Sequence, residues 1–183
     1  MEHKETTNSN YLNVNIRKLS PTAIVPEYAT VGSAGLDLTA VRIGIERGED
    51  GVPVLVYDTQ LSIEIPAGYV GLLFMRSSVA KKSLTMTNAV GVIDSDYRGP
   101  VLAKFKVTTN TTPSIYEEGE RVVQLVIVEI PKIKFNIVED ATVTERGEGG
   151  FGSTDDVAKV EANDTKSDEQ AGDESVNEAE SLS

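Results

Sequence analysis

Two carboxylates and a tyrosine stand close together in the stretch N-A-V-G-V-I-D-S-D-Y-R-G, residues 88–99. The apolar residues before Asp94 read as a strand, Asp, Ser and Gly favour a turn, and residues 101–107 offer a return strand. The stretch therefore predicts a β-hairpin whose loop carries Asp94, Asp96 and Tyr97. Such a loop can present acids, an aromatic ring and backbone amides to a flat ligand, although the same residues also suit a surface turn whose acids only face water.

A second group of polar residues could handle phosphate. Arg76, Ser77 and Ser78 join a guanidinium to two hydroxyls at the start of a short helical segment, which suits phosphate oxygens or simply a capped helix. Asp37 lies between two leucines in a predicted strand, either at an exposed edge or held at a site. Gln124 stands in an otherwise apolar strand, where its amide needs a partner from the protein or from a ligand.

The run R-G-E-G-G-F-G-S-T, residues 146–154, places four glycines around one phenylalanine. A run so rich in glycine is too flexible to order itself. Arg146, Ser153 and Thr154 can nevertheless grip phosphates, and Phe151 can stack on a base. We expect an arm that folds over a ligand; a plain glycine-rich linker is the alternative.

The composition narrows the chemistry further. The chain has 183 residues, of which 39% are hydrophobic, and this suits one folded domain. It has no cysteine and a single histidine, His3, so disulfides, thiolate metal sites and cysteine nucleophiles are excluded. Catalysis must then use carboxylates, hydroxyls, amides and arginines. Because the sequence has neither an apolar signal segment nor a membrane-length apolar run, we expect a cytoplasmic protein that does not bind membranes.

The net charge of −12 is concentrated at the C-terminus, because residues 155–183 carry ten acids and two lysines. This acidic tail lacks aromatic residues and is predicted to be disordered, as is the polar leader at residues 1–10. The acidity argues against nucleic-acid binding. The tail is a candidate binding segment for a protein partner of unknown identity.

Apolar and alternating runs between glycine- and proline-containing turns predict many short strands, and hence an antiparallel sandwich or jelly roll. The strands are expected at residues 12–16, 35–40, 52–57, 61–65, 69–75, 101–107, 121–130 and 134–138. Within this body only residues 77–82 read as helical.

The five polar clusters, in this order and spacing, resemble those of the trimeric all-β dUTPases, the deoxyuridine triphosphate nucleotidohydrolases, over roughly residues 12–154. The most specific matches are G-V-I-D-S-D-Y-R-G and R-G-E-G-G-F-G-S-T. The resemblance implies a distorted jelly roll or β-barrel at residues 11–140, a flexible active-site arm at residues 141–154, and a homotrimer with shared active sites. It also implies Mg²⁺-dependent hydrolysis of dUTP to dUMP and pyrophosphate, which keeps uracil out of DNA and supplies dUMP for thymidylate synthesis.

The resemblance also assigns roles to single residues. Asp94 is the expected catalytic residue, a buried carboxylate that orients the water attacking the α-phosphorus, and Tyr97 is expected to pack on the deoxyribose. Asp37 is expected to position Mg²⁺ through bound water. Uracil contacts are expected from Asn88, Val92, Ile93 and Leu102, phosphate contacts from Arg76, Ser77, Ser78, Gln124, Arg146, Gly152, Ser153 and Thr154, and a cover over the uracil from Phe151.

Two departures from the family pattern and two alternatives accompany this interpretation. Ser78 stands where the family usually has glycine, and residues 44–59 form a longer connection that we expect to be a surface hairpin. A dCTP deaminase-like enzyme of the same fold needs a glutamate on the strand after the third motif, where this chain has Lys104. A nucleotide-sensing regulatory protein is the second alternative; the presence of Asp94 and Arg146 argues against lost catalysis but not against a second role.

Overall fold

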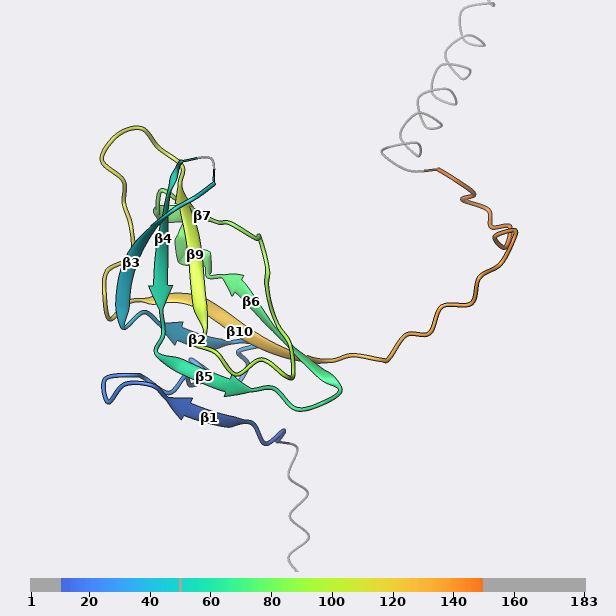
Figure 1. Ribbon diagram of the computed structural model, residues 1–183, viewed down its shortest axis with the longest axis horizontal. Helices are drawn as coiled ribbons and strands as arrows, with labels where there is room; N and C mark the ends of the chain where they lie inside the picture. Colours follow the sequence, from blue (N-terminus) through green and yellow to red (C-terminus); the bar gives the residue numbers. More distant parts are fainter. Residues whose placement is uncertain (1–10, 50, 150–183) are drawn as a thin grey trace, which may run out of the picture. The chain divides into compact units, whose positions relative to one another are not determined.

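The computed structural model of the chain describes residues 11–49 and 51–149 (Figure 1). The chain divides into two units, Met1–Ile133 and Lys134–Ser183. The first unit holds all the strands of the described residues and one short 3₁₀ helix. The strands are β1 (Asn15–Lys18), β2 (Leu36–Thr39), β3 (Arg42–Arg47), β4 (Pro53–Asp58), β5 (Leu61–Glu64), β6 (Tyr69–Met75), β7 (Leu84–Met86), β8 (Gly91–Ile93), β9 (Leu102–Val107) and β10 (Arg121–Glu129), and the helix is η1 (Ser77–Lys81).

The strands form three sheets, in which all pairings are antiparallel. One four-stranded sheet has the order β2-β10-β6-β8, a second has the order β3-β4-β9-β7, and β1 pairs with β5. Apart from the β3–β4 hairpin, paired strands are not consecutive in the sequence, so the chain crosses repeatedly between sheets. This all-β architecture confirms the predicted fold class.

The core takes its side chains from both four-stranded sheets. Three aromatic residues lie at its centre, Tyr57 of β4, Phe105 of β9 and Tyr116 in the loop before β10, and each is at most 1% exposed. Their rings meet edge to face, with the centroids of Tyr57 and Phe105 5.4 Å apart. Such contacts contribute about 0.5–1.5 kcal/mol per pair beyond the buried area, so this cluster is a rigid reference point for the loops around it.

Most of the strands predicted from the sequence are confirmed. Those expected at residues 35–40, 52–57, 61–65, 69–75, 101–107 and 121–130 correspond to β2, β4, β5, β6, β9 and β10. The surface hairpin expected within residues 44–59 is the β3–β4 pair, and the helical segment is η1. The described residues contain no helix long and apolar enough to cross a membrane.

Three strand predictions were incomplete or wrong. The first strand begins at Asn15, three residues later than the alternation from residue 12 suggested, and the three-residue β7 was not predicted. Residues 134–138 form no strand in the described part of the chain, where Phe135 is 86% exposed and Ile137 is fully exposed. Alternating residues form a strand only beside a partner strand, and this segment has none among the described residues.

The predicted hairpin at residues 88–107 is also wrong in its pairing. β8 pairs with β6, whereas β9 pairs with β4 and β7, so the two expected hairpin arms belong to different sheets. The chain leaves β7 through a tight turn in which Ala89 has φ 56, enters β8, and crosses back to reach β9. The loop with Asp94 and Tyr97 therefore bridges two sheets and does not close one ladder.

Candidate active site

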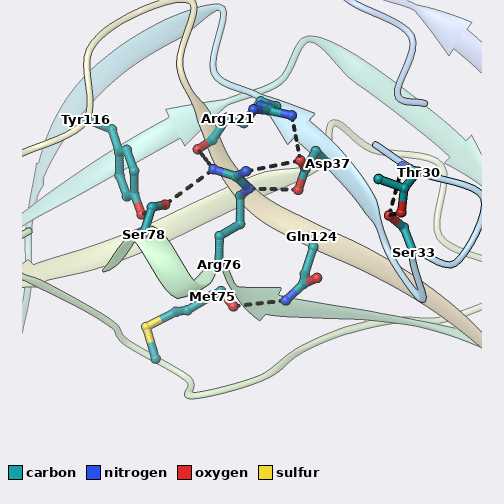
Figure 2. A network of polar contacts seen from close by, with 9 residues as sticks. All are labelled: Thr30, Ser33, Asp37, Met75, Arg76, Ser78, Tyr116, Arg121 and Gln124. Atoms are coloured by element: carbon teal, nitrogen blue, oxygen red, sulfur yellow. Dashed lines mark hydrogen bonds and ion pairs between the residues drawn. The ribbon is translucent and has the colours of Figure 1, made fainter. Parts of the chain in front are cut away.

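A cluster of two arginines and one aspartate lies where β2, β6 and β10 meet (Figure 2). Asp37 accepts hydrogen bonds from Arg76, with Nε 2.7 Å from Oδ1 and Nη2 3.1 Å from Oδ2. Arg121 adds a third, with Nη1 3.0 Å from Oδ2. The Asp37 side chain is only 14% exposed, so the three charges interact in a partly desolvated place, and two guanidiniums against one carboxylate leave a net positive charge.

The strand register explains why these residues meet. Asp37 on β2 lies directly opposite Gln124 on β10, so both side chains point to the same face. A β-bulge between Arg121 and Val123 adds a residue to β10, which brings the Arg121 side chain to the Asp37 face. A Cβ at Gly35 would lie 3.1 Å from Gln124 Oε1, so a side chain there would crowd the amide.

The remaining phosphate-site residues predicted on this side divide into two kinds. Gln124 donates from Nε2 to the carbonyl oxygen of Met75, 3.2 Å away, so its amide has a structural partner. The Ser78 hydroxyl lies 3.3 Å from Arg76 Nη1 and 3.0 Å from the hydroxyl of Tyr116. Ser77, in contrast, is exposed at the start of η1 and lies outside this network of the described residues.

The residues present fit a magnesium ion only through water. A carboxylate offers about four lone-pair sites, and three of those of Asp37 already accept from guanidiniums. No group of three His, Cys, Asp or Glu side chains within residues 11–49 and 51–149 could hold a metal ion. Asp37 can therefore accept a hydrogen bond from a metal-bound water, while the metal itself needs ligands from a bound triphosphate.

A pocket of about 320 Å³ opens where the chain crosses between the sheets. Its walls come from β6, β7, the β7–β8 turn, β8, the β8–β9 loop and β9, and its lining residues are mostly apolar. The sequence-predicted residues that line it are Asn88, Val92, Ile93, Asp94, Tyr97 and Leu102. These six residues therefore line one pocket. They meet because the chain crosses from one sheet to the other, not because the two strands form a hairpin.

Asp94 and Tyr97 lie at the rim of this pocket. Asp94 is exposed, which corrects the expectation that it is buried, because residues 94–100 form a surface crossing between β8 and β9. Tyr97 is 43% exposed, and its hydroxyl donates to the carbonyl oxygen of Pro100, 3.0 Å away. A Cβ at Gly99 would overlap the Tyr97 hydroxyl, so glycine is needed there for this ring position.

The second unit is described only in part. Residues 144–149 make a local turn in which Arg146 Nε donates to the carbonyl oxygen of Gly149, 3.0 Å away, and Gly147 N–H donates to Thr144 Oγ1. The predictions for Phe151, Gly152, Ser153 and Thr154 lie outside the described residues.

Sequence reasoning missed four residues around the cluster. Arg121 bonds Asp37, Tyr116 contacts Ser78, and Lys82 lies with Nζ 4.7 Å from the Tyr116 ring centre and 3.1 Å from Glu120 Oε2. The backbone N–H of Glu117 and then Lys82 hold the pKa of Glu120 below its usual range. Burial raises the pKa of Tyr57, whose hydroxyl donates to the Tyr116 carbonyl oxygen. Arg121 stands three residues before Gln124, but only the bulge reveals that they share a face.

The fold and the site define a class of all-β proteins suited to small phosphorylated ligands. The arginine cluster can bind an anionic group, and the separate pocket can hold a small planar group. Comparison with known proteins makes the class specific. The family model for dUTPase matches residues 22–155 of this chain. The chain belongs to the dUTPase family.

Individual relatives agree with the family match. A deoxyuridine 5'-triphosphate nucleotidohydrolase of Paraburkholderia phymatum is 44% identical over 132 residues, which cover 71% of this chain and 88% of that protein. One of Bordetella pertussis is 43% identical over 132 residues, covering 71% of this chain and 87% of that protein. A solved structure of a Staphylococcus bacteriophage 80alpha dUTPase variant with dUpNHpp has a TM-score of 0.66 and 29% identity, and covers 78% of this chain and 98% of that one.

Proposed function

We propose that this chain hydrolyses dUTP to dUMP and pyrophosphate by attack of water on the α-phosphorus. The observation that carries the proposal is the pocket between the sheets, which is lined by Asn88, Asp94 and Tyr97. Uracil is flat and has two carbonyl oxygens and one ring N–H. A pocket of about 320 Å³ has room for a pyrimidine and part of a sugar.

Uracil is read by the turn and strands that line the pocket. The Asn88 amide and the backbone of Val92, Ile93 and Leu102 offer donors and acceptors that match uracil O4 and N3–H. Cytosine presents the reversed pattern of donor and acceptor at these two positions. It would leave polar groups of the pocket without hydrogen bonds, and this weakens its binding relative to uracil. Apolar walls close to C5 leave no room for the methyl group of thymine, so dCTP and dTTP are rejected.

The sugar and the attacking water are handled at the rim. The Tyr97 ring packs against C2′ of deoxyribose, which excludes the 2′-hydroxyl of a ribonucleotide. The Asp94 carboxylate accepts a hydrogen bond from the water, orients it in line with the α-phosphorus and takes its proton. Exposure of Asp94 in the single chain leaves it accessible to water and substrate.

The phosphates bind at the cationic cluster. Arg76, with Ser77, the backbone of Ser78 and Gln124, contacts the phosphate chain. Arg146 with Gly152, Ser153 and Thr154 contacts its distal end, while Phe151 covers the base. Asp37 would hold Mg²⁺ through bound water, and a bound Mg²⁺ would supply positive charge to the phosphate oxygens. A solved phage phi11 dUTPase is described with a structural Mg(II) ion.

The active site is shared between copies in a homotrimer. In such an assembly the pocket and the arginine cluster, which have no residue in common within the described chain, can be contributed by different subunits. Large apolar side chains such as Tyr11, Val31 and Ile45 are also highly exposed, as expected of surfaces that other copies cover.

Pyrophosphate release from each deoxynucleoside triphosphate tests this function. The full chain with Mg²⁺ should release pyrophosphate from dUTP. The rates with dCTP, dTTP and dATP should each be less than about 1% of the rate with dUTP. Ammonia release from dCTP would instead support the deaminase alternative. We do not expect it, because Lys104, at the position where that enzyme has a glutamate, is paired with Glu46 at 2.6 Å. Binding of dUTP without turnover would support the nucleotide-sensing alternative.

A further inference from the structure

We propose that Ser78 and Tyr116 are positioning residues that aim the guanidinium of Arg76 at the triphosphate. The inference rests on the proposed function, in which Arg76 contacts phosphate. The Ser78 hydroxyl lies between the other two groups, with Oγ 3.3 Å from Arg76 Nη1 and 3.0 Å from the Tyr116 hydroxyl (Figure 2). The contact depends on a side chain that a glycine at residue 78 would lack.

The donor and acceptor chemistry fixes the direction of the first bond in this relay, the chain of contacts from Arg76 through Ser78 to Tyr116. A guanidinium can only donate, so Ser78 Oγ accepts from Arg76. In the second bond either hydroxyl can donate to the other. With either sense of the second bond, Ser78 links Arg76 to Tyr116.

Tyr116 is a rigid anchor for this relay. It is 1% exposed, and its ring meets the rings of Tyr57 and Phe105 edge to face, with centroids 6.0 and 6.3 Å away. Its backbone is fixed as well, since Tyr57 OH donates to its carbonyl oxygen and accepts from its N–H. Lys82 lies over the ring and donates to the Ile115 carbonyl oxygen, 2.7 Å away.

The relay determines which part of Arg76 faces a ligand. Asp37 accepts from Nε and Nη2, while Ser78 and the Arg121 carbonyl oxygen both accept from Nη1. A guanidinium has five N–H groups, so the bonds within the described residues leave one N–H on Nη2 for a phosphate oxygen. Asp37 fixes one edge of the plane, and Ser78 with Tyr116 restrains the opposite corner. Without the Ser78 bond, only the Arg121 carbonyl oxygen restrains that corner, so the plane can tilt more easily about the Asp37 edge.

Three variants test the relay. Tyr116→Phe removes only the hydroxyl and keeps the ring contacts, Ser78→Ala removes the acceptor for Arg76, and Ser78→Thr keeps a hydroxyl. We expect kcat/KM for dUTP to fall about 3- to 10-fold in Tyr116→Phe and in Ser78→Ala, and to recover in Ser78→Thr. The double variant should be no worse than Ser78→Ala alone, because both losses act through Ser78. Tyr28→Phe, which removes an exposed hydroxyl, is the matched control.

A second readout separates positioning from a general structural role. The affinity for α,β-imido-dUTP should fall in Tyr116→Phe by the same factor as kcat/KM, while the affinity for deoxyuridine, which has no phosphate, stays unchanged. Wild-type values of both quantities in Tyr116→Phe and Ser78→Ala would overturn the inference, as would an equal loss for deoxyuridine and imido-dUTP. Failure of the wild-type chain to hydrolyse dUTP would refute the proposed function, and the inference with it; an active wild type with unaffected variants refutes the inference alone.

Discussion

Asp94 is the one carboxylate with a proposed role as the catalytic base. Asp94→Asn keeps the shape and loses the base, so we expect turnover of dUTP to fall by about 10²-fold or more while binding of α,β-imido-dUTP is largely kept. Asp96→Asn is the matched control, because Asp96 is an exposed carboxylate two residues away that does not line the pocket. Wild-type turnover in Asp94→Asn would remove Asp94 from the mechanism.

We expect Tyr97 to determine the choice of sugar. Its ring lies at the rim of the pocket and is fixed by its bond to the Pro100 carbonyl oxygen. Tyr97→Ala removes the surface that excludes a 2′-hydroxyl, so the ratio of kcat/KM for dUTP over UTP should fall about 10-fold or more. Side-by-side kinetics with both nucleotides measure this ratio. A variant that discriminates as strongly as the wild type would show that another residue reads the sugar.

At the residue scale, the sequence indicated which polar residues to consider but not their burial or their hydrogen-bond partners. The resemblance to the dUTPases placed Asp37, Arg76 and Gln124 at one site. In the structure Asp37 lies opposite Gln124 on the neighbouring strand and accepts hydrogen bonds from Arg76. The bulge that turns Arg121 toward Asp37 could not be predicted from the sequence. Val122 and Val123 are both apolar and both buried, so either could face the core. The exposure of Asp94 likewise depends on a crossing between sheets.

At the scale of elements, strands were predictable and their partners were not. Residues 90–93 and 101–107 read as the two arms of a hairpin, because a turn sequence separates two apolar runs. Their pairing was decided by β6 and β7, which take the hydrogen bonds of β8 and β9. A local pattern contains no information about a competing strand tens of residues away. Residues of both segments nevertheless line the same pocket.

The turn before β10 makes the stability of the fold depend on pH. Glu120 Oε2 accepts from the Glu117 N–H at 2.7 Å and from Lys82 Nζ at 3.1 Å, and these bonds lower its pKa from the ordinary 4.5. A carboxylate whose pKa is depressed by folding stabilises the folded state above its unfolded pKa. That stability is lost as the pH falls through the folded pKa.

Glu120→Gln should therefore lower the free energy of unfolding at about pH 7, by about 0.2–1 kcal/mol because the pair is partly exposed. The difference from the wild type should shrink as the pH falls below the ordinary glutamate pKa of 4.5. Melting curves between about pH 3 and pH 7 measure it. Glu117→Gln, in the same turn with an exposed side chain, is the control. A difference that stays constant with pH would show that the Glu120 charge does not contribute.

At the scale of the whole molecule, the C-terminal residues divide into a part with ligand chemistry and a part without it. The family match ends at residue 155, directly after the run that contains Arg146 and Phe151. The acidic tail that follows has a net charge of −8 and would repel a triphosphate. We expect a chain ending at Asp155 to keep near-normal activity, and one ending at Glu145 to keep its oligomeric state but hydrolyse dUTP about 10²-fold more slowly or worse.

Steady-state kinetics and light scattering on both truncations check this division. Full activity in the chain that ends at Glu145 would show that Arg146 and Phe151 do not complete the site. A large loss in the chain that ends at Asp155 would instead give the acidic tail a role in the reaction.

The most direct test of the central claim is hydrolysis of dUTP by the full chain in ¹⁸O-labelled water, with mass analysis of both products. Water oriented by Asp94 toward the α-phosphorus should place the label in the phosphate of dUMP and leave the pyrophosphate unlabelled. Label in the pyrophosphate, or release of phosphate with dUDP as the other product, would contradict the proposed attack on the α-phosphorus.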